Sequence, residues 1–173
     1  MDYANSVLTG LPAYLVKRLQ SVLNASTRLI YGLRQFDHVS NALMSLHWLR
    51  IPEHIQFKLA VLVHRVLHGN APEYHGPFPR LSDVPSRSSL RSASSNHLLI
   101  PPVRRSTVGA RAFTVSGPTL WNSLPSDITS IDSLPVFRHH LQIIYSVIHT
   151  QALFNNYTFL SLPRSFLYCT WSR

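Results

Sequence analysis

Arg111 to Asp127 reads Arg-Ala-Phe-Thr-Val-Ser-Gly-Pro-Thr-Leu-Trp-Asn-Ser-Leu-Pro-Ser-Asp, and this stretch decides how the chain folds. It is rich in large apolar side chains, each of which contributes about 1.5 to 3 kcal/mol to stability when it is buried. The sequence therefore predicts a structural core that is built around four of them, Phe113, Leu120, Trp121 and Leu124.

The backbone of the same stretch is punctuated by glycine and proline. Gly117 and Pro118 predict a sharp reversal, with Pro118 at the first position of a short helix. Pro125 is expected to end that helix at Leu124. Only the amphipathic segments on either side of this stretch can cover its apolar side chains, so we expect them to pack around it.

The composition of the chain is basic. Its 173 residues, 45% of them hydrophobic, are enough for one domain with a core. Sixteen Lys and Arg stand against seven Asp and Glu, which gives a formal charge of +9, and 14 of the 16 are Arg. Because the planar Arg side chain suits phosphate groups and stacks on bases, nucleic acid is the first partner to expect and an acidic membrane surface the second. The alternative is a basic, solvated surface without a specific partner.

Cys169 is the only cysteine, so one chain can form neither a disulfide framework nor a cysteine zinc site. The sequence has no apolar run of about 18 residues and no signal-peptide pattern at its N-terminus. These features predict a soluble, intracellular protein without a membrane span, located in the cytoplasm or the nucleus.

A long amphipathic helix is predicted from Pro12 to Leu33. Its apolar stripe is expected to consist of Leu15, Leu19, Val22, Leu29, Ile30 and Leu33. The opposite, exposed face is expected to carry Lys17, Gln20, Ser21, Asn24 and Arg28. A basic helix face of this kind suits a phosphate backbone, although it can also be merely solvated.

Three further helices are predicted over residues 38–49, 52–68 and 133–150. Asp37 is expected to cap the first of these and Asp132 or Ser133 the last. The helix over 52–68 is apolar almost all round, which predicts a central position between the first helix and the unit around Trp121. With the short helix over 118–124, the expected fold is a mainly α, irregular helical domain with a long Ser/Arg/Pro-rich loop and a short extended segment.

The Ser/Arg/Pro-rich loop is expected at about residues 77–96 and to be flexible. After it, residues 98–100 predict a short extended segment that pairs back onto the core. The arginines in and beyond this loop form the densest basic region of the chain. Together with three basic residues of the first helix, they are the candidate nucleic-acid-binding residues: Lys17, Arg18, Arg28, Arg80, Arg87, Arg91, Arg104, Arg105 and Arg111.

No catalytic arrangement stands out in the sequence. His64 and His68 are spaced to share a helix face, as metal ligands would be, but no third ligand is evident and a packed or solvated pair is the better interpretation. Asp127 and Asp132 are typical turn or cap residues. The sequence also lacks a Gly-rich phosphate loop, a nucleophile elbow and the paired aspartates of a polymerase. We therefore expect no enzyme activity, no metal site and no cofactor.

A collinear set of short motifs runs through residues 1–150. It comprises Asp2-Tyr3-Ala4-Asn5-Ser6-Val7-Leu8, Gly10-Leu11-Pro12, Leu19-Gln20, Asn24-Ala25, Arg28-Leu29, Phe36-Asp37-His38-Val39, Leu46-His47-Trp48-Leu49, Leu67-His68-Gly69, Ala71-Pro72, Tyr74, Leu90-Arg91-Ser92, Arg111-Ala112-Phe113 and Leu120-Trp121-Asn122-Ser123-Leu124-Pro125. In this order the motifs resemble the region just beyond the reverse transcriptase core in the polyproteins of LINE-type (non-LTR, jockey-like) retrotransposons. These polyproteins often have Cys where this chain has Ala4.

The resemblance implies a thumb-like helical region that follows the endonuclease and polymerase parts and contains none of their catalytic residues. Its implied partner is template RNA or an RNA–DNA duplex, gripped without sequence preference during target-primed reverse transcription. Residues 151–173 lie beyond the resemblance and are interpreted as an unrelated apolar tail. The alternatives are a non-catalytic interaction module, which could associate with itself through exposed apolar surface, and an expressed relic without an evolved function.

Overall fold

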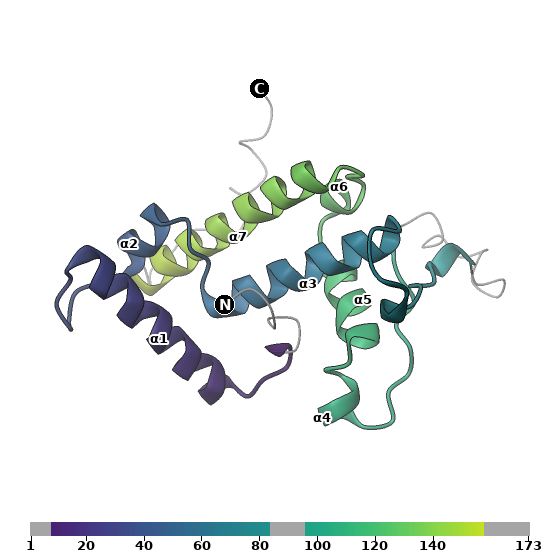
Figure 1. Ribbon diagram of the computed structural model, residues 1–173, viewed down its shortest axis with the longest axis horizontal. Helices are drawn as coiled ribbons and strands as arrows, with labels where there is room; N and C mark the ends of the chain where they lie inside the picture. The colour runs from purple at the N-terminus through teal and green to yellow at the C-terminus, as the bar shows by residue number, and fades with distance from the viewer. Residues whose placement is uncertain (1–7, 84–95, 158–173) are drawn as a thin grey trace.

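The computed structural model describes residues 8–83 and 96–157, and these fold mainly as α-helices, which confirms the predicted fold class (Figure 1). The helices are α1 (Ala13–Tyr31), α2 (Ser40–Ser45), α3 (Ile51–Leu67), α4 (Ser106–Gly109), α5 (Phe113–Ser123), α6 (Ser126–Thr129) and α7 (Leu134–Tyr157). Two 3-10 turns, Glu73–His75 and Leu81–Asp83, lie between α3 and α4.

Helix α3 lies at the centre of the molecule, in contact with α1, α5 and α7 (Figure 1). This confirms the position predicted for the helix that is apolar almost all round. Pro52 and Glu53 lie in its first turn, where neither conflicts with helical hydrogen bonding. The chain leaves α3 through Gly69, whose φ of 68° belongs to the left-handed region that favours glycine. Buried side chains occur along the whole helix, from Ile51 to His64.

Helix α5 differs from the prediction. It begins at Phe113 instead of Pro118, and Pro118 lies buried inside it. No reversal occurs at Gly117. A Cβ at this position would lie 3.0 Å from Val63 Cγ2 and 3.2 Å from Phe78 Cζ, so the glycine allows α5 to approach α3 closely. Glycine here serves helix packing, which sequence reasoning mistook for a turn signal.

Pro118 is tolerated within α5 because of where the lost hydrogen bond falls. A proline has no N–H, so the carbonyl of Thr114, one turn earlier, receives no hydrogen bond from it. Thr114 lies in the first turn of α5 and is exposed, so water can reach its carbonyl. The apolar proline ring itself is buried in the core.

Trp121 is the centre of the main core cluster. Its side chain is 2% exposed, and its ring stacks on that of Phe137 with the centroids 5.8 Å apart. Its indole Nε1 donates a hydrogen bond to the Asn96 carbonyl at 3.1 Å, so the one polar atom of the side chain is satisfied. The other expected core residues, Phe113, Leu120 and Leu124, are partly buried and pack against this cluster.

Asn122 holds the extended segment that returns to the core. Its Oδ1 accepts a hydrogen bond from Leu98 N at 2.8 Å, and its Nδ2 donates one to Leu98 O at 2.9 Å. On the other side, Arg80 and Leu98 form an isolated antiparallel bridge. The predicted pairing of this segment is confirmed.

Only part of the loop predicted for residues 77–96 lies among the described residues. Within residues 77–83, Phe78 is buried in the core and Leu81–Asp83 form a 3-10 turn. The remainder of the loop, residues 84–95, lies outside the described residues. The ring of Phe78 packs against that of Phe113, with the centroids 5.3 Å apart.

Two other helices have different ends from those predicted. Helix α2 covers Ser40–Ser45 and not 38–49, because the chain turns at His47, whose φ is 54°. Asp37 does not cap it, since its Oδ2 accepts a hydrogen bond from Arg34 N at 2.7 Å. Helix α7 runs to Tyr157, beyond the predicted end at residue 150.

We expect Trp121→Ala to lower the free energy of unfolding by about 3 to 5 kcal/mol, the range for truncating a large buried aromatic side chain. Urea or thermal unfolding followed by circular dichroism measures this. Phe36→Ala is the control, because Phe36 is 91% exposed and its truncation should change stability by no more than about 0.5 kcal/mol. Equal stability of the two variants would contradict the central position of Trp121.

We expect Gly117→Ala to destabilise the fold as well, although alanine is the better helix former. The new Cβ would press on Val63 and Phe78, which are buried and have little room to move. Such overpacking lowers the free energy of unfolding by about 1 to 3 kcal/mol, whereas the higher helix propensity of alanine raises it by about 1 kcal/mol. We therefore expect a net loss of about 1 kcal/mol, whereas Thr114→Ala on the exposed side of α5 should be neutral or stabilising. A Gly117→Ala variant as stable as the parent would disprove the close approach.

Candidate nucleic-acid interface

Helix α1 faces the rest of the protein with polar residues. Gln20 Oε1 accepts a hydrogen bond from Ile51 N at 2.9 Å, and Gln20 Nε2 donates one to Asn24 Oδ1 at 2.9 Å. Thr27, one turn further, is fully buried. The structure therefore corrects the sequence analysis, which placed Gln20 and Asn24 on the exposed face. The physical reason is that Ile51 is the first residue of α3, so its N–H has no partner within its own helix and Gln20 supplies one.

Half of the predicted apolar stripe of α1 is turned outward. Leu15, Leu19 and Leu33 are half-buried. In contrast, Val22 is 50%, Leu29 85% and Ile30 56% exposed. The expectation that these three residues face the core is wrong, because the inward side of the helix is occupied by Gln20, Leu23 and Thr27.

Lys17 and Arg18 lie in the second turn of α1 and are exposed. Arg28, expected on the same exposed face, is half-buried, and its Nε is buried without a hydrogen-bond partner among the described residues. Lys17 and Arg18 are therefore the two basic side chains of α1 that a ligand can reach most readily.

Arg111 brings a distant part of the chain to the start of α1. A Cβ on Gly10 would lie 2.7 Å from Arg111 Cγ, so the arginine lies directly over this glycine. Arg104 and Arg105, both exposed, come just before α4 and are separated from Arg111 by that single helical turn. We call Lys17, Arg18, Arg104, Arg105 and Arg111 the basic band.

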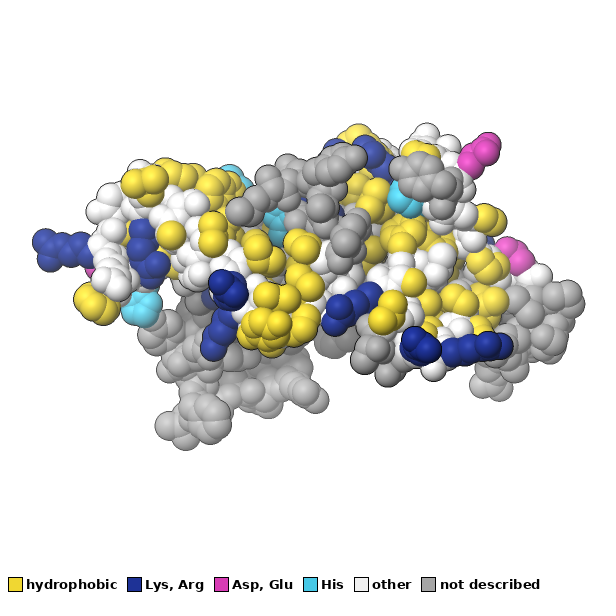
Figure 2. Space-filling model, turned by 60° about the horizontal axis from the view of Figure 1, so that its bottom comes forward, with side chains coloured by type: hydrophobic (Ala, Val, Ile, Leu, Met, Phe, Trp, Pro, Cys, Tyr) yellow, Lys and Arg dark blue, Asp and Glu magenta, His cyan; other side chains and the backbone are white. Residues whose placement is uncertain are grey.

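Figure 2 shows the side of the molecule on which α1 and α4 lie, and Lys and Arg side chains recur across this face. The Asp and Glu side chains that can be seen there lie at its edges. The sequence explains this, since neither α1 nor residues 104–111 contain an acidic residue. Nothing within these segments neutralises the band, and a positive surface of this kind attracts polyanions.

Among the described residues, one further candidate, Arg80, does not join the basic band. Arg80 is exposed but pairs with Leu98 beyond α5, where it lines a small hollow with His68 and Trp121. Arg87 and Arg91 lie outside the described residues. Sequence reasoning thus found the members of the band but not their grouping, because the contact between Gly10 and Arg111 leaves no local pattern.

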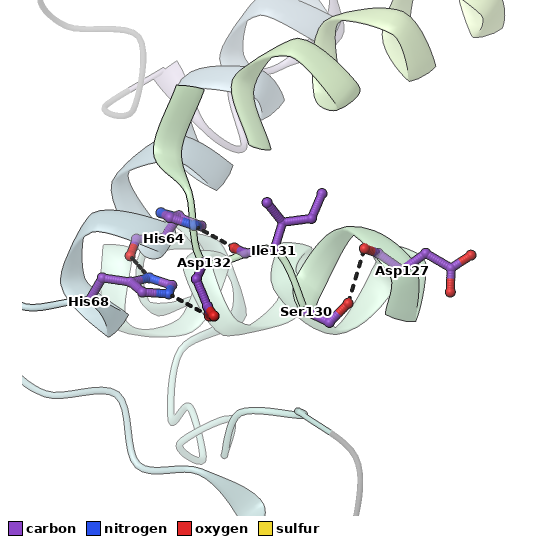
Figure 3. Close-up of polar contacts among 6 residues, drawn as sticks. All are labelled: His64, His68, Asp127, Ser130, Ile131 and Asp132. Atoms are coloured by element: carbon purple, nitrogen blue, oxygen red, sulfur yellow. Dashed lines mark hydrogen bonds and ion pairs between the residues drawn. The ribbon is translucent and has the colours of Figure 1, made fainter. Parts of the chain in front are cut away.

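His64 and His68 form a packed pair on α3, one of the two arrangements that the sequence left open (Figure 3). Their rings stack with centroids 4.0 Å apart. His64 Nε2 lies 2.8 Å from Ile131 O, and His68 Nδ1 lies 2.8 Å from His64 O, which fixes both nitrogens as donors. His68 Nε2 is 3.5 Å from Asp132 Oδ1. Asp132 therefore interacts with His68, although it was expected as a possible helix cap.

This arrangement suits packing better than chemistry. His64 is 1% exposed, and its Nδ1 has no hydrogen-bond partner among the described residues. Burial lowers the pKa of His64 below its usual 6.5, and the neighbouring His68 lowers it further, while the bond to Ile131 and the charge of Asp132 act in the opposite direction. Among the described residues, no group of three His, Cys, Asp or Glu side chains could hold a metal ion.

Compared with known families, curated proteins and solved structures, the chain matches none. No described helix combines the length and the apolar character that crossing a membrane requires.

We expect the lowered pKa of His64 to make the fold less stable in acid. Below pH 6.5 the unfolded chain takes up a proton at His64 that the folded protein does not. The free energy of unfolding therefore decreases as the pH is lowered, by at most about 1.4 kcal/mol for each pH unit, until His64 is protonated in the folded protein as well. Urea unfolding at pH 7.5 and pH 5 measures this loss. It should be smaller in His64→Gln and unchanged in His38→Gln, an exposed control. If the His64→Gln variant showed the same pH dependence of stability as the parent, the loss of stability in acid would not arise from His64.

Proposed function

We propose that this chain binds RNA or an RNA–DNA duplex through the phosphates, with little preference for sequence. The observation that carries the proposal is the basic band: exposed cationic side chains of α1 and of residues 104–111 lie on one face of the molecule (Figure 2), and neither segment contains an acidic residue. The contact of Arg111 with Gly10 links the two segments. Contacts from Lys and Arg to phosphates provide affinity and orientation. They do not distinguish one base from another, because they do not reach the base edges.

The proposal includes an origin for the chain. We infer that residues 1–150 are a non-catalytic part of a LINE-type reverse transcriptase polyprotein, which would use the band to hold template RNA or the RNA–DNA duplex. Several of the residues that carry this resemblance have structural roles that explain their identity. Gly10 lies under Arg111, Trp121 fills the core, and Asn122 holds Leu98. The chemistry of polymerisation and cleavage would lie elsewhere in such a polyprotein.

The size of the band sets the expected strength of binding. About four neutralised phosphates give a slope of roughly 3 to 4 when log K is plotted against log salt on a duplex. An increase from 50 to 200 mM salt should then weaken binding about a hundredfold, and affinity at physiological salt should be micromolar or weaker.

We expect the double variant Lys17→Gln/Arg18→Gln to reduce that slope by about one to two units and to leave the melting curve unchanged, because both side chains are exposed. Fluorescence anisotropy with labelled RNA and DNA over a salt series measures it. The control is Arg80→Gln/Arg138→Gln, which removes the same charge from exposed positions outside the band. Identical slopes for the two double variants would contradict the basic band as the binding surface, and binding without salt dependence would contradict the function itself.

A second candidate function, an interaction module, is favoured by two neighbouring hollows around Trp48. They measure about 590 and 490 Å³ and share His47, Trp48, Leu49 and Gln142. Trp48 is 36% exposed there, and aromatic side chains of this kind are common anchors in protein interfaces. Association with another protein that persists at high salt would support this function over nucleic-acid binding.

A further inference from the structure

The outward side of α1 carries a continuous stripe, Tyr14, Arg18, Val22, Ala25 and Leu29, at the spacing of three and four residues that places side chains on one helix face. We call it the outer stripe. All of its residues are exposed, Tyr14 by 63%, Val22 by 50% and Leu29 by 85%. Thr27, which is fully buried, lies on the opposite side of the helix. The stripe is therefore an apolar surface with a single arginine in it.

We propose that the outer stripe lies on the surface of an anionic lipid bilayer, with α1 parallel to the membrane plane. Charge complementarity identifies this occupant. The sequence from Tyr3 to Phe36 contains no Asp or Glu. The exposed Lys17 lies beside the stripe on α1, and the exposed Arg34 follows the helix. An amphipathic helix with a basic rim and an apolar face is the type that inserts between headgroups, where anionic lipids attract its cations.

The hydroxyl groups beside the stripe are already satisfied. Ser21 Oγ donates to Arg18 O at 2.7 Å, and Ser26 Oγ donates to Val22 O at 3.0 Å. Because these hydrogen bonds are made to the helix's own backbone, the two serines lose little when water is removed around them. The flanks of the stripe can therefore enter the headgroup region with less loss of free energy than unpaired hydroxyls would suffer.

Arg18 distinguishes a bilayer from a second copy of the chain. Pairing two outer stripes would bury this guanidinium in an apolar seam, and α1 offers no acidic residue to pair with it. At a bilayer surface the aliphatic part of Arg18 can lie among apolar groups while its guanidinium reaches a lipid phosphate. A nucleic acid would satisfy Arg18 but would leave Val22 and Leu29 uncovered.

Two further apolar side chains are exposed near the end of the helix. Ile30 is 56% and Phe36 91% exposed, and Phe36 lies in the turn between α1 and α2. Figure 1 places this end of α1 at the periphery of the molecule, away from α5 and α6.

Sedimentation with vesicles tests the proposal on the full chain. Vesicles of phosphatidylcholine with about one-third phosphatidylserine should bind the protein, and vesicles of phosphatidylcholine alone should bind it at least about tenfold more weakly. The double variant Val22→Gln/Leu29→Gln should lose at least about tenfold in binding to the anionic vesicles, since it removes the groups that enter the bilayer. Arg18→Gln should lose about fivefold.

The matched control is Val108→Gln/Val136→Gln, at positions 70% and 44% exposed outside α1, which should bind like the parent. All variants should keep the parent's melting curve, and Val22→Gln/Leu29→Gln should keep its RNA affinity, which separates this proposal from nucleic-acid binding. Equal binding by parent and Val22→Gln/Leu29→Gln, or binding independent of phosphatidylserine, overturns the proposal. Sedimentation equilibrium that shows a dimer for the parent and a monomer for this variant also overturns it and assigns the stripe to a second copy.

Discussion

The fold depends on how closely α5 can approach α3. This close approach is possible because Gly117 of α5 has no side chain. At Gly117 the neighbouring atoms of Val63 and Phe78 lie where a larger residue would need room. The close contact brings Trp121, one turn further along α5, into the space between α3 and α7, where it meets Phe137. Since packed interiors leave little free volume, this contact also determines where α7 can lie.

A second constraint acts at the other end of α3. The first N–H groups of any helix lack partners in their own helix, and Arg50, at the cap position, provides no side-chain hydrogen bond. Gln20 supplies one from α1, which orients α1 with its polar side inward. The outward position of Val22 and Leu29 follows from this orientation. This hydrogen bond therefore contributes to the choice of the surface that α1 presents to solvent.

The sequence allowed the helices with strong patterns to be predicted, and the reasons for the errors are physical. The helix around Leu59 is apolar on all sides, so its central position could be inferred without knowing its neighbours. Glycine and proline in α5 were misjudged, because a residue that permits a turn also permits close packing. The rotation of α1 was misjudged because it depends on a partner 31 residues away in sequence, which periodicity does not reveal. The candidate basic residues could be identified by type, but their grouping depends on the tertiary contact between Gly10 and Arg111.

Because of the two hydrogen bonds between Asn122 and Leu98, the fold does not depend on the length of the connection between residues 80 and 98. With Arg80 bridged to Leu98 and Leu98 held by Asn122, residues 80 and 98 are neighbours whatever number of residues joins them. The entropy of closing a connection rises only slowly with its length, by about 0.6 kcal/mol for each doubling. Insertions and deletions between these two anchor points should therefore accumulate among relatives without disturbing the helices. The same position is a natural place at which to graft a reporter or an affinity tag into the chain.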